Sequence, residues 1–157
     1  MKIKNKTIFG FHKKKLNQWF LFWGVVGFGF LALTFFITST LIGIDVRERC
    51  LISQAQYKGD CVEALIQVID DETNSFDERN RAIWALGQMG DIRGKQVLEK
   101  YYTGIIPSKE PYNKTLSQYE MKKALKLVNG GLNITHYVWG KKPAPKKKMK
   151  VFGKMKA

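Results

Sequence analysis

Residues 19–44 read WFLFWGVVGFGFLALTFFITSTLIGI, and this run contains no charged side chain. As an α-helix rising 1.5 Å per residue it would extend about 39 Å, more than the roughly 30 Å hydrocarbon core of a bilayer. A helix of this length in a soluble protein would need a polar face, which the run lacks. Trp19 and Trp23 suit the aromatic belt of a membrane interface, and Asp45 follows the other end. We therefore predict a single transmembrane helix over residues 19–44.

The positive charge of the chain lies at its two ends. The formal net charge is +14, yet between residues 45 and 140 the sequence has 13 basic and 13 acidic side chains. The excess comes from six lysines in residues 1–18 and eight in residues 141–157, and neither segment contains an acid. We divide the chain into a basic cytoplasmic flank (1–18), the transmembrane helix, a neutral helical domain (45–140) and a Lys-rich tail (141–157), which we expect to be disordered.

The lysines before the transmembrane helix predict its orientation. Basic residues gather on the cytoplasmic side of a membrane helix, and only Arg47, Arg49 and Lys58 follow within about 20 residues of the run. We expect a cytoplasmic (inner) membrane protein with its N-terminus inside and its domain outside. The alternative is a cleaved signal peptide. The run is, however, longer than the apolar core of such peptides, and no alanine-type cleavage site follows it.

The two cysteines, Cys50 and Cys61, are candidates for a disulfide. Outside the membrane, in an oxidising compartment, such a pair is typical of a covalent staple. The turn-forming run Tyr57-Lys58-Gly59-Asp60 between them could bring them together. The alternative is two buried thiols that act as small apolar side chains.

The chain after Asp45 has a helical pattern throughout, so we predict an all-α fold. Three segments begin with Asp or Ser followed three residues later by Glu, the signature of a capping box. Apolar residues at helical spacing follow each start, and a further helix is expected over residues 91–102. The capping pairs are Asp60 with Glu63, Ser75 with Glu78, and Ser117 with Glu120. The residues expected to close the domain as an irregular cap are Leu132, Ile134, Tyr137, Val138 and Trp139.

The run RAIWALGQMGD, residues 81–91, resembles the bacterial HEAT-like repeat of the phycobilisome-lyase type. Gly59-Asp60 repeats the Gly90-Asp91 turn, and a weaker copy covers residues 119–131. The resemblance implies a transmembrane helix followed by a short HEAT-like α-solenoid of two to three helical pairs, in which neighbouring pairs bury each other's apolar faces. It implies little about function.

The sequence contains no recognisable catalytic motif. It lacks a nucleophile elbow, a Walker glycine loop and a paired-histidine metal helix. HEAT-like enzymes such as the deoxyhypusine hydroxylases carry His-Glu pairs, which this chain does not have. We therefore predict no catalysis, no cofactor and no metal site.

The leading hypothesis is a membrane-anchored interaction module or scaffold that binds another protein, held to the lipid bilayer by Trp19–Ile44. Candidate partner contacts are Arg93, Lys95, Glu99 and Tyr112, the last in a proline-containing loop that could equally be a simple bridge. Trp84 is expected to be an inter-helix core residue, with partner contact as the alternative. The alternative function is binding of a polyanion or anionic surface through the tail lysines Lys146, Lys147, Lys148 and Lys150. The sequence does not determine the oligomeric state.

Overall fold

The computed structural model describes residues 7–140, with side chains from residue 18 onward. The first residues of the basic flank and the whole Lys-rich tail, with Lys146, Lys147, Lys148 and Lys150, lie outside the described residues. Within this range every regular element is helical, as the sequence predicts. The chain divides into two units, residues 1–41 and 42–157, which are described separately.

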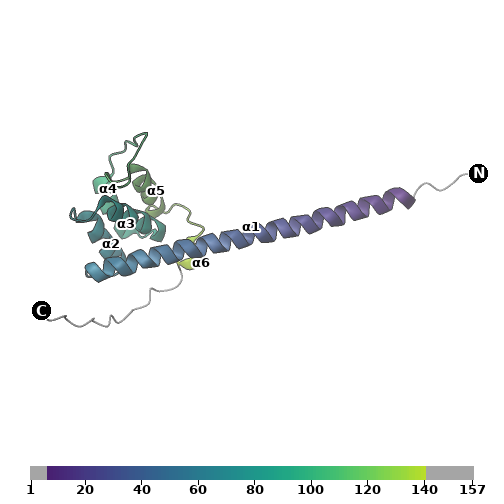
Figure 1. Cartoon of the computed structure of the whole chain (residues 1–157), viewed down its shortest axis with the longest axis horizontal. Helices are drawn as coiled ribbons and strands as arrows, with labels where there is room; N and C mark the ends of the chain where they lie inside the picture. The colour runs from purple at the N-terminus through teal and green to yellow at the C-terminus, as the bar shows by residue number, and fades with distance from the viewer. Residues whose placement is uncertain (1–6, 141–157) are drawn as a thin grey trace, which may run out of the picture. The chain divides into compact units, whose positions relative to one another are not determined.

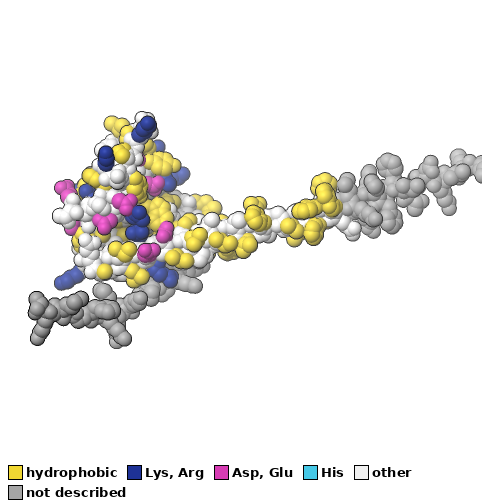
Figure 2. Space-filling model, in the orientation of Figure 1, with side chains coloured by type: hydrophobic (Ala, Val, Ile, Leu, Met, Phe, Trp, Pro, Cys, Tyr) yellow, Lys and Arg dark blue, Asp and Glu magenta, His cyan; other side chains and the backbone are white. Residues whose placement is uncertain are grey.

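The first unit consists of the N-terminal part of helix α1, which spans Thr7–Gln56. From Gln18 onward α1 is long and apolar enough to cross a membrane. Figure 2 shows hydrophobic side chains along the surface of this part of α1. Val25, Phe28 and Leu31 are among the exposed ones. A soluble protein would bury such a surface against a core, because each exposed apolar Å² costs about 25 cal/mol.

Helix α1 continues without a break past Asp45 into the second unit. Residues 46–56 are thus the last part of α1 and not a separate element. Val46 and Cys50 on this part are buried in the core of the domain.

Up to residue 140, where the description of the second unit ends, five further α-helices and one 3-10 turn follow α1. Helix α3 packs against both α2 and α5, and α4 also contacts α2 and α5 (Figure 1). The core is built from the apolar faces that the helical spacing predicts, including Leu65, Ile83 and Met121, which are all fully buried. The elements are α2 (Cys61–Asp70), α3 (Phe76–Met89), η1 (Ile92–Gly94), α4 (Lys95–Tyr101), α5 (Gln118–Val128) and α6 (His136–Trp139).

Capping side chains fix where α2 and α3 begin. The Asp60 carboxylate accepts from the backbone N–H of Glu63 at 2.9 Å, and the Glu63 carboxylate accepts from the Asp60 N–H at 3.0 Å. Ser75 and Glu78 form the same reciprocal pair. Each pair satisfies amides that the helix itself leaves without partners, and both capping boxes are therefore confirmed.

The third expected capping box is only half formed. Ser117 Oγ accepts from the backbone N–H of Glu120 at 3.1 Å, as predicted. The return bond is absent because the Ser117 N–H donates to the side chain of Asn80 instead, at 2.8 Å. Glu120 pairs with Lys123 at 3.2 Å. A tertiary hydrogen bond has therefore replaced the local one.

Gly87 allows α3 and α5 to approach closely. A Cβ added at Gly87 would lie 2.7 Å from both Cα and Cβ of Ala124, a separation that real atoms do not adopt. The Ala-Leu-Gly end of α3 thus has a packing role, because a larger residue would push the two helices apart.

The expected C-terminal cap is only partly correct. Trp139 is half-buried and packs against the core, but Leu132, Ile134 and Tyr137 are exposed. Tyr137 is exposed because α6 is a single turn, so only one side of it can face the domain, whereas Leu132 and Ile134 lie in the irregular segment before α6.

Replacing Gly87 by alanine should destabilise the domain, although alanine is the better helix former. The helix propensity gain is about 1 kcal/mol, whereas overpacking against the backbone of a neighbouring helix costs about 1–3 kcal/mol. Chemical denaturation of the full chain in detergent would measure the change. Lys122→Ala, on the exposed side of α5, is the matched control and should leave the midpoint unchanged. A Gly87→Ala midpoint at or above that of the unmodified chain would contradict the packing role.

Candidate protein-binding groove

A groove of about 380 Å³ runs between the end of α1, helix α3 and the loop that precedes α5. It is lined by two aromatic side chains and four charged ones, and we call it the aromatic groove after the two rings. The lining residues are Asp45 and Arg49 of α1, Asp77, Arg81 and Trp84 of α3, and Tyr112 of the loop.

The loop that carries Tyr112 is held to α3 by one buried side chain. Asn80 is completely inaccessible to solvent. Its Nδ2 donates to the carbonyl oxygens of Tyr112 and Thr115, each at 2.8 Å, and its Oδ1 accepts from the Ser117 N–H at 2.8 Å. A buried amide that lost these partners would cost about 1–3 kcal/mol, so the loop conformation and the position of Tyr112 are coupled to the core.

A carboxylate secures the end of the same loop. Glu110 accepts from Ser117 Oγ at 2.6 Å and from the backbone N–H of Gln118 at 2.9 Å. These groups form the N-terminus of α5, where a negative charge is stabilised by the helix dipole and by amides without intrahelical partners. The second half of the loop between α4 and α5 is therefore a structured part of the domain.

The charges of the groove are balanced. Arg81 and Asp77 form an ion pair at 2.8 Å along one face of α3. Partial burial raises the pKa of the Tyr112 hydroxyl, and the nearby carboxylates of Glu120 and Asp77 raise it further. Tyr112 therefore stays neutral at physiological pH and offers a hydroxyl donor at the end of an apolar ring.

The composition of the groove suits contact with a protein. Trp84 is half-buried against the core, while 39 % of the Tyr112 surface remains exposed. Tryptophan, tyrosine and arginine are the residues that most often dominate the binding energy of protein interfaces. In the described part of the chain no group of three or more His, Cys, Asp or Glu residues is arranged to hold a metal ion.

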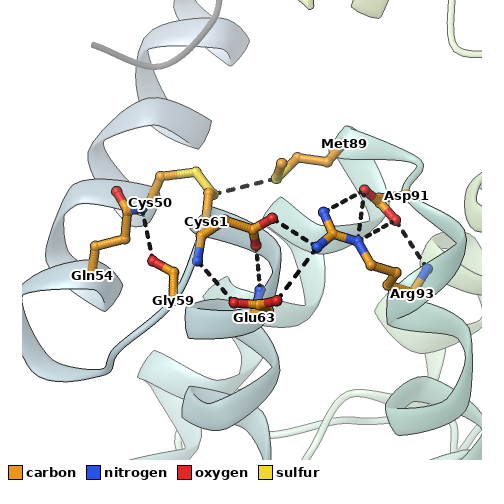
Figure 3. The surroundings of a disulfide bond; sticks show 9 residues. Cys50, Gln54, Gly59, Cys61, Glu63, Met89, Asp91 and Arg93 are labelled. Carbon is orange, nitrogen blue, oxygen red and sulfur yellow. Dashed lines mark hydrogen bonds and ion pairs between the residues drawn. A yellow bond between two sulfur atoms is a disulfide. The ribbon is translucent and has the colours of Figure 1, made fainter. Parts of the chain in front are cut away.

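Of the four described residues expected to contact a partner, only Tyr112 lines this groove. Arg93 is committed to other groups: its guanidinium donates to Asp60 at 2.7 Å and to Asp91 at 2.9 Å (Figure 3). Lys95 and Glu99 form an ion pair with each other on α4, at 3.6 Å. The tertiary structure therefore separates Tyr112 from the other three candidates.

The Arg93 contacts link the start of α2 to the turn before α4. The Arg93 hydrogen bonds lower the pKa of Asp91. Partial burial acts to raise the pKa of Asp60, but hydrogen bonds from the Glu63 amide and from Arg93 outweigh it, and the net shift is downward. Because Arg93 bridges two carboxylates that also begin helical segments, its first role is structural.

The same region contains a disulfide between Cys50 of α1 and Cys61 of α2, whose Cα atoms are 5.0 Å apart (Figure 3). Met89 Sδ lies 3.5 Å from Cys61 Sγ, so the bridge is also in contact with the end of α3. The disulfide fixes the last turns of α1 to the first turn of α2.

In comparisons with protein-family models, curated proteins and solved structures, nothing matches this chain. The function must therefore be argued from the residues themselves. Sequence reasoning overlooked Asp45, Arg49, Asp77 and Arg81 as groove residues, and it overlooked Asn80 as the residue that holds the loop. A polar residue on the apolar face of α3 was the one available signal for Asn80.

Replacing Asn80 by alanine should loosen the loop and destabilise the domain. The change leaves two carbonyls and one amide without their buried partner, and we expect a loss of about 2–4 kcal/mol in the free energy of unfolding. Limited proteolysis should show new cleavage between residues 103 and 116. Asn113→Ala, an exposed residue in the same loop, is the control. Equal protection of both variants would show that Asn80 does not hold the loop.

Reducing the disulfide should lower the free energy of unfolding by about 2–3 kcal/mol, the loop-entropy value for a closed loop of this length. Denaturant titrations of the full chain with and without reductant would measure this difference. A Cys50→Ser/Cys61→Ser double variant should match the reduced protein and show no response to reductant. A reductant effect of equal size in that variant would contradict the assignment.

Proposed function

We propose that this chain is a single-pass membrane protein whose helical domain binds another protein through the aromatic groove, without catalysis. The observation that carries the proposal is the pairing of Trp84 and Tyr112 beside Arg49 and Arg81 in one hollow of the surface. An aromatic anchor next to an arginine is the usual composition of an energetic centre in an interface.

The rigidity of the groove supports the same proposal. Trp84 lies on α3, packed against the core, and Tyr112 is positioned by the Asn80 hydrogen bonds. A preorganised surface loses little conformational freedom on binding, so more of the contact energy appears as affinity.

We place the domain outside a cytoplasmic membrane, with α1 as the anchor and the N-terminus inside. The length and apolar character of α1 support the anchor, and the six lysines before the run support the orientation. The Cys50–Cys61 disulfide suits an oxidising compartment. Anchoring would raise the local concentration of the groove for a partner in the same membrane.

We also propose that the helical domain is a short HEAT-like solenoid. The pairing pattern supports it: α2 packs on α3 and α4 on α5 within successive hairpins, while α2 contacts α4 and α3 contacts α5 between them. Such nearest-neighbour packing in two layers is the arrangement by which helical repeats bury their apolar faces.

The test is capture of a partner by the full chain in lipid nanodiscs, with solubilised membranes and extract from the source cells. Tyr112→Ala should deplete a protein that the unmodified chain retains. Loss of a central aromatic anchor costs about 2 kcal/mol, which corresponds to roughly 30-fold in the dissociation constant. Quantitative mass spectrometry of the bound proteins would measure the depletion.

Tyr119→Ala is the matched control, because Tyr119 is exposed on α5 and does not line the groove. Identical sets of bound proteins for both tyrosine variants would contradict the groove as the binding site.

Deleting residues 141–157 distinguishes protein binding by the groove from the alternative function, polyanion binding by the tail. A polyanion binder would lose its salt-dependent binding with the tail, whereas a protein-binding domain would keep its partner.

A further inference from the structure

The segment after α5 returns to the point at which the uncharged run of α1 ends. Helix α6 lies beside α1 (Figure 1). Trp139 of α6 packs directly on Gly43 of α1, where an added Cβ would lie 2.5 Å from the Cβ of Trp139. Gly43 lies two positions before Asp45, the first charged residue after the apolar run. Residues 132–140 are therefore attached to α1 at the level where a membrane-spanning helix would leave the hydrocarbon.

Close packing holds α6 in this position. The indole N–H of Trp139 and the ring Nδ1 of His136 are buried without hydrogen-bond partners in the part of the chain that the structure describes. The two rings contact each other edge to face, with centroids 4.7 Å apart. The two rings are held by packing, with Trp139 against Gly43. Asn133 Nδ2 also donates to the Gln88 carbonyl at 2.9 Å, so the Gly43 contact and this hydrogen bond together place the segment.

Three apolar side chains close to Trp139 in the sequence are exposed to solvent. Leu132, Ile134 and Tyr137 have exposed fractions of 74 %, 56 % and 68 %. These three residues are separated in sequence by a few positions only, so the exposed surface belongs to one short segment. Leaving it in water is unfavourable, because apolar surface is stabilised when it is removed from water.

The chemistry of the segment matches the surface of a bilayer. Tyrosine and tryptophan concentrate at membrane interfaces, because the ring enters the acyl boundary while the polar end stays among the headgroups. Aliphatic side chains beside them add buried area, as in interfacial anchors. Lys141 and Lys142 follow in the sequence, and basic residues are attracted to the surface of an anionic leaflet.

We propose that residues 132–140 form a second membrane contact, in which Leu132, Ile134 and Tyr137 enter the headgroup region of an anionic bilayer while Trp139 docks the segment on Gly43. The proposal rests on the membrane anchor proposed above. The second contact would hold the domain in a fixed orientation on the membrane surface. A single helix joined to a free domain would not do so.

The experiment measures the depth of a nitroxide spin label on the full chain in vesicles of phosphatidylcholine with phosphatidylglycerol. Because Cys50 and Cys61 are bridged, a Tyr137→Cys variant can be labelled at one thiol without reductant. The label at position 137 should lose accessibility to an aqueous nickel complex and gain accessibility to oxygen, relative to the same label introduced by Tyr119→Cys. Leu132→Cys gives an independent second position and should behave as position 137 does.

Equal nickel accessibility at positions 132, 137 and 119 would overturn the proposal. A label introduced by Leu31→Cys reports on the anchor itself: if position 31 is also open to nickel, the membrane anchor fails and the second contact fails with it. If position 31 is protected and position 137 is not, only the second contact fails. Protection at 137 that disappears as the protein is diluted in lipid would instead show contact with a second copy of the chain, which also overturns the proposal.

A Gly43→Val change tests the docking step. It fills the space that Trp139 occupies, so the label at position 137 should regain nickel accessibility while the label at position 31 stays protected. Continued protection at 137 in this variant would show that Gly43 does not position the segment.

Discussion

The arrangement of this domain depends on the hydrogen bonds of Asn80. Its amide is fully buried on α3. Two of its partners are carbonyl oxygens of the loop before α5, and the third is the backbone N–H of Ser117, the N-cap residue of α5. A buried amide cannot be left unsatisfied without a cost of about 1–3 kcal/mol, so the loop must close onto α3 for the domain to fold. That closure brings Tyr112 beside Trp84 and so creates the aromatic groove.

Charged surface residues are poor guides to the site for a separate reason, because they pair with one another. Arg93 resembles a partner contact in the sequence, yet its guanidinium is shared between Asp60 and Asp91. Lys95 and Glu99 form an ion pair, four residues apart, on α4. Exposed ion pairs contribute little to stability. The Arg93 contacts join the residues that begin α2 and η1. The groove, in contrast, combines aromatic rings with charges that remain balanced.

Helix α1 connects the two proposed environments of the protein. Its final turns carry Val46 and Cys50 into the core of the domain, and Cys50 is bonded to α2. Gly43, at the end of the uncharged run, receives Trp139 from the last helix. The domain is thus attached through packing, through a covalent bridge and through the C-terminal segment. All three attachments lie within a few turns of Asp45, where the chain changes from apolar to charged.

The sequence by itself determined the long apolar helix, the all-helical pattern, the apolar faces and the starts at Asp60 and Ser75, because these depend on interactions within a few residues. Only the tertiary structure decided the return bond at Ser117, the structural role of Arg93 and the exposure of Tyr137. Each of those depends on which groups from distant segments compete for the same partner or cover the same surface. Local spacing predicts a helix and its buried face, whereas a site made by a loop, two helices and one buried amide exists only after the chain has folded.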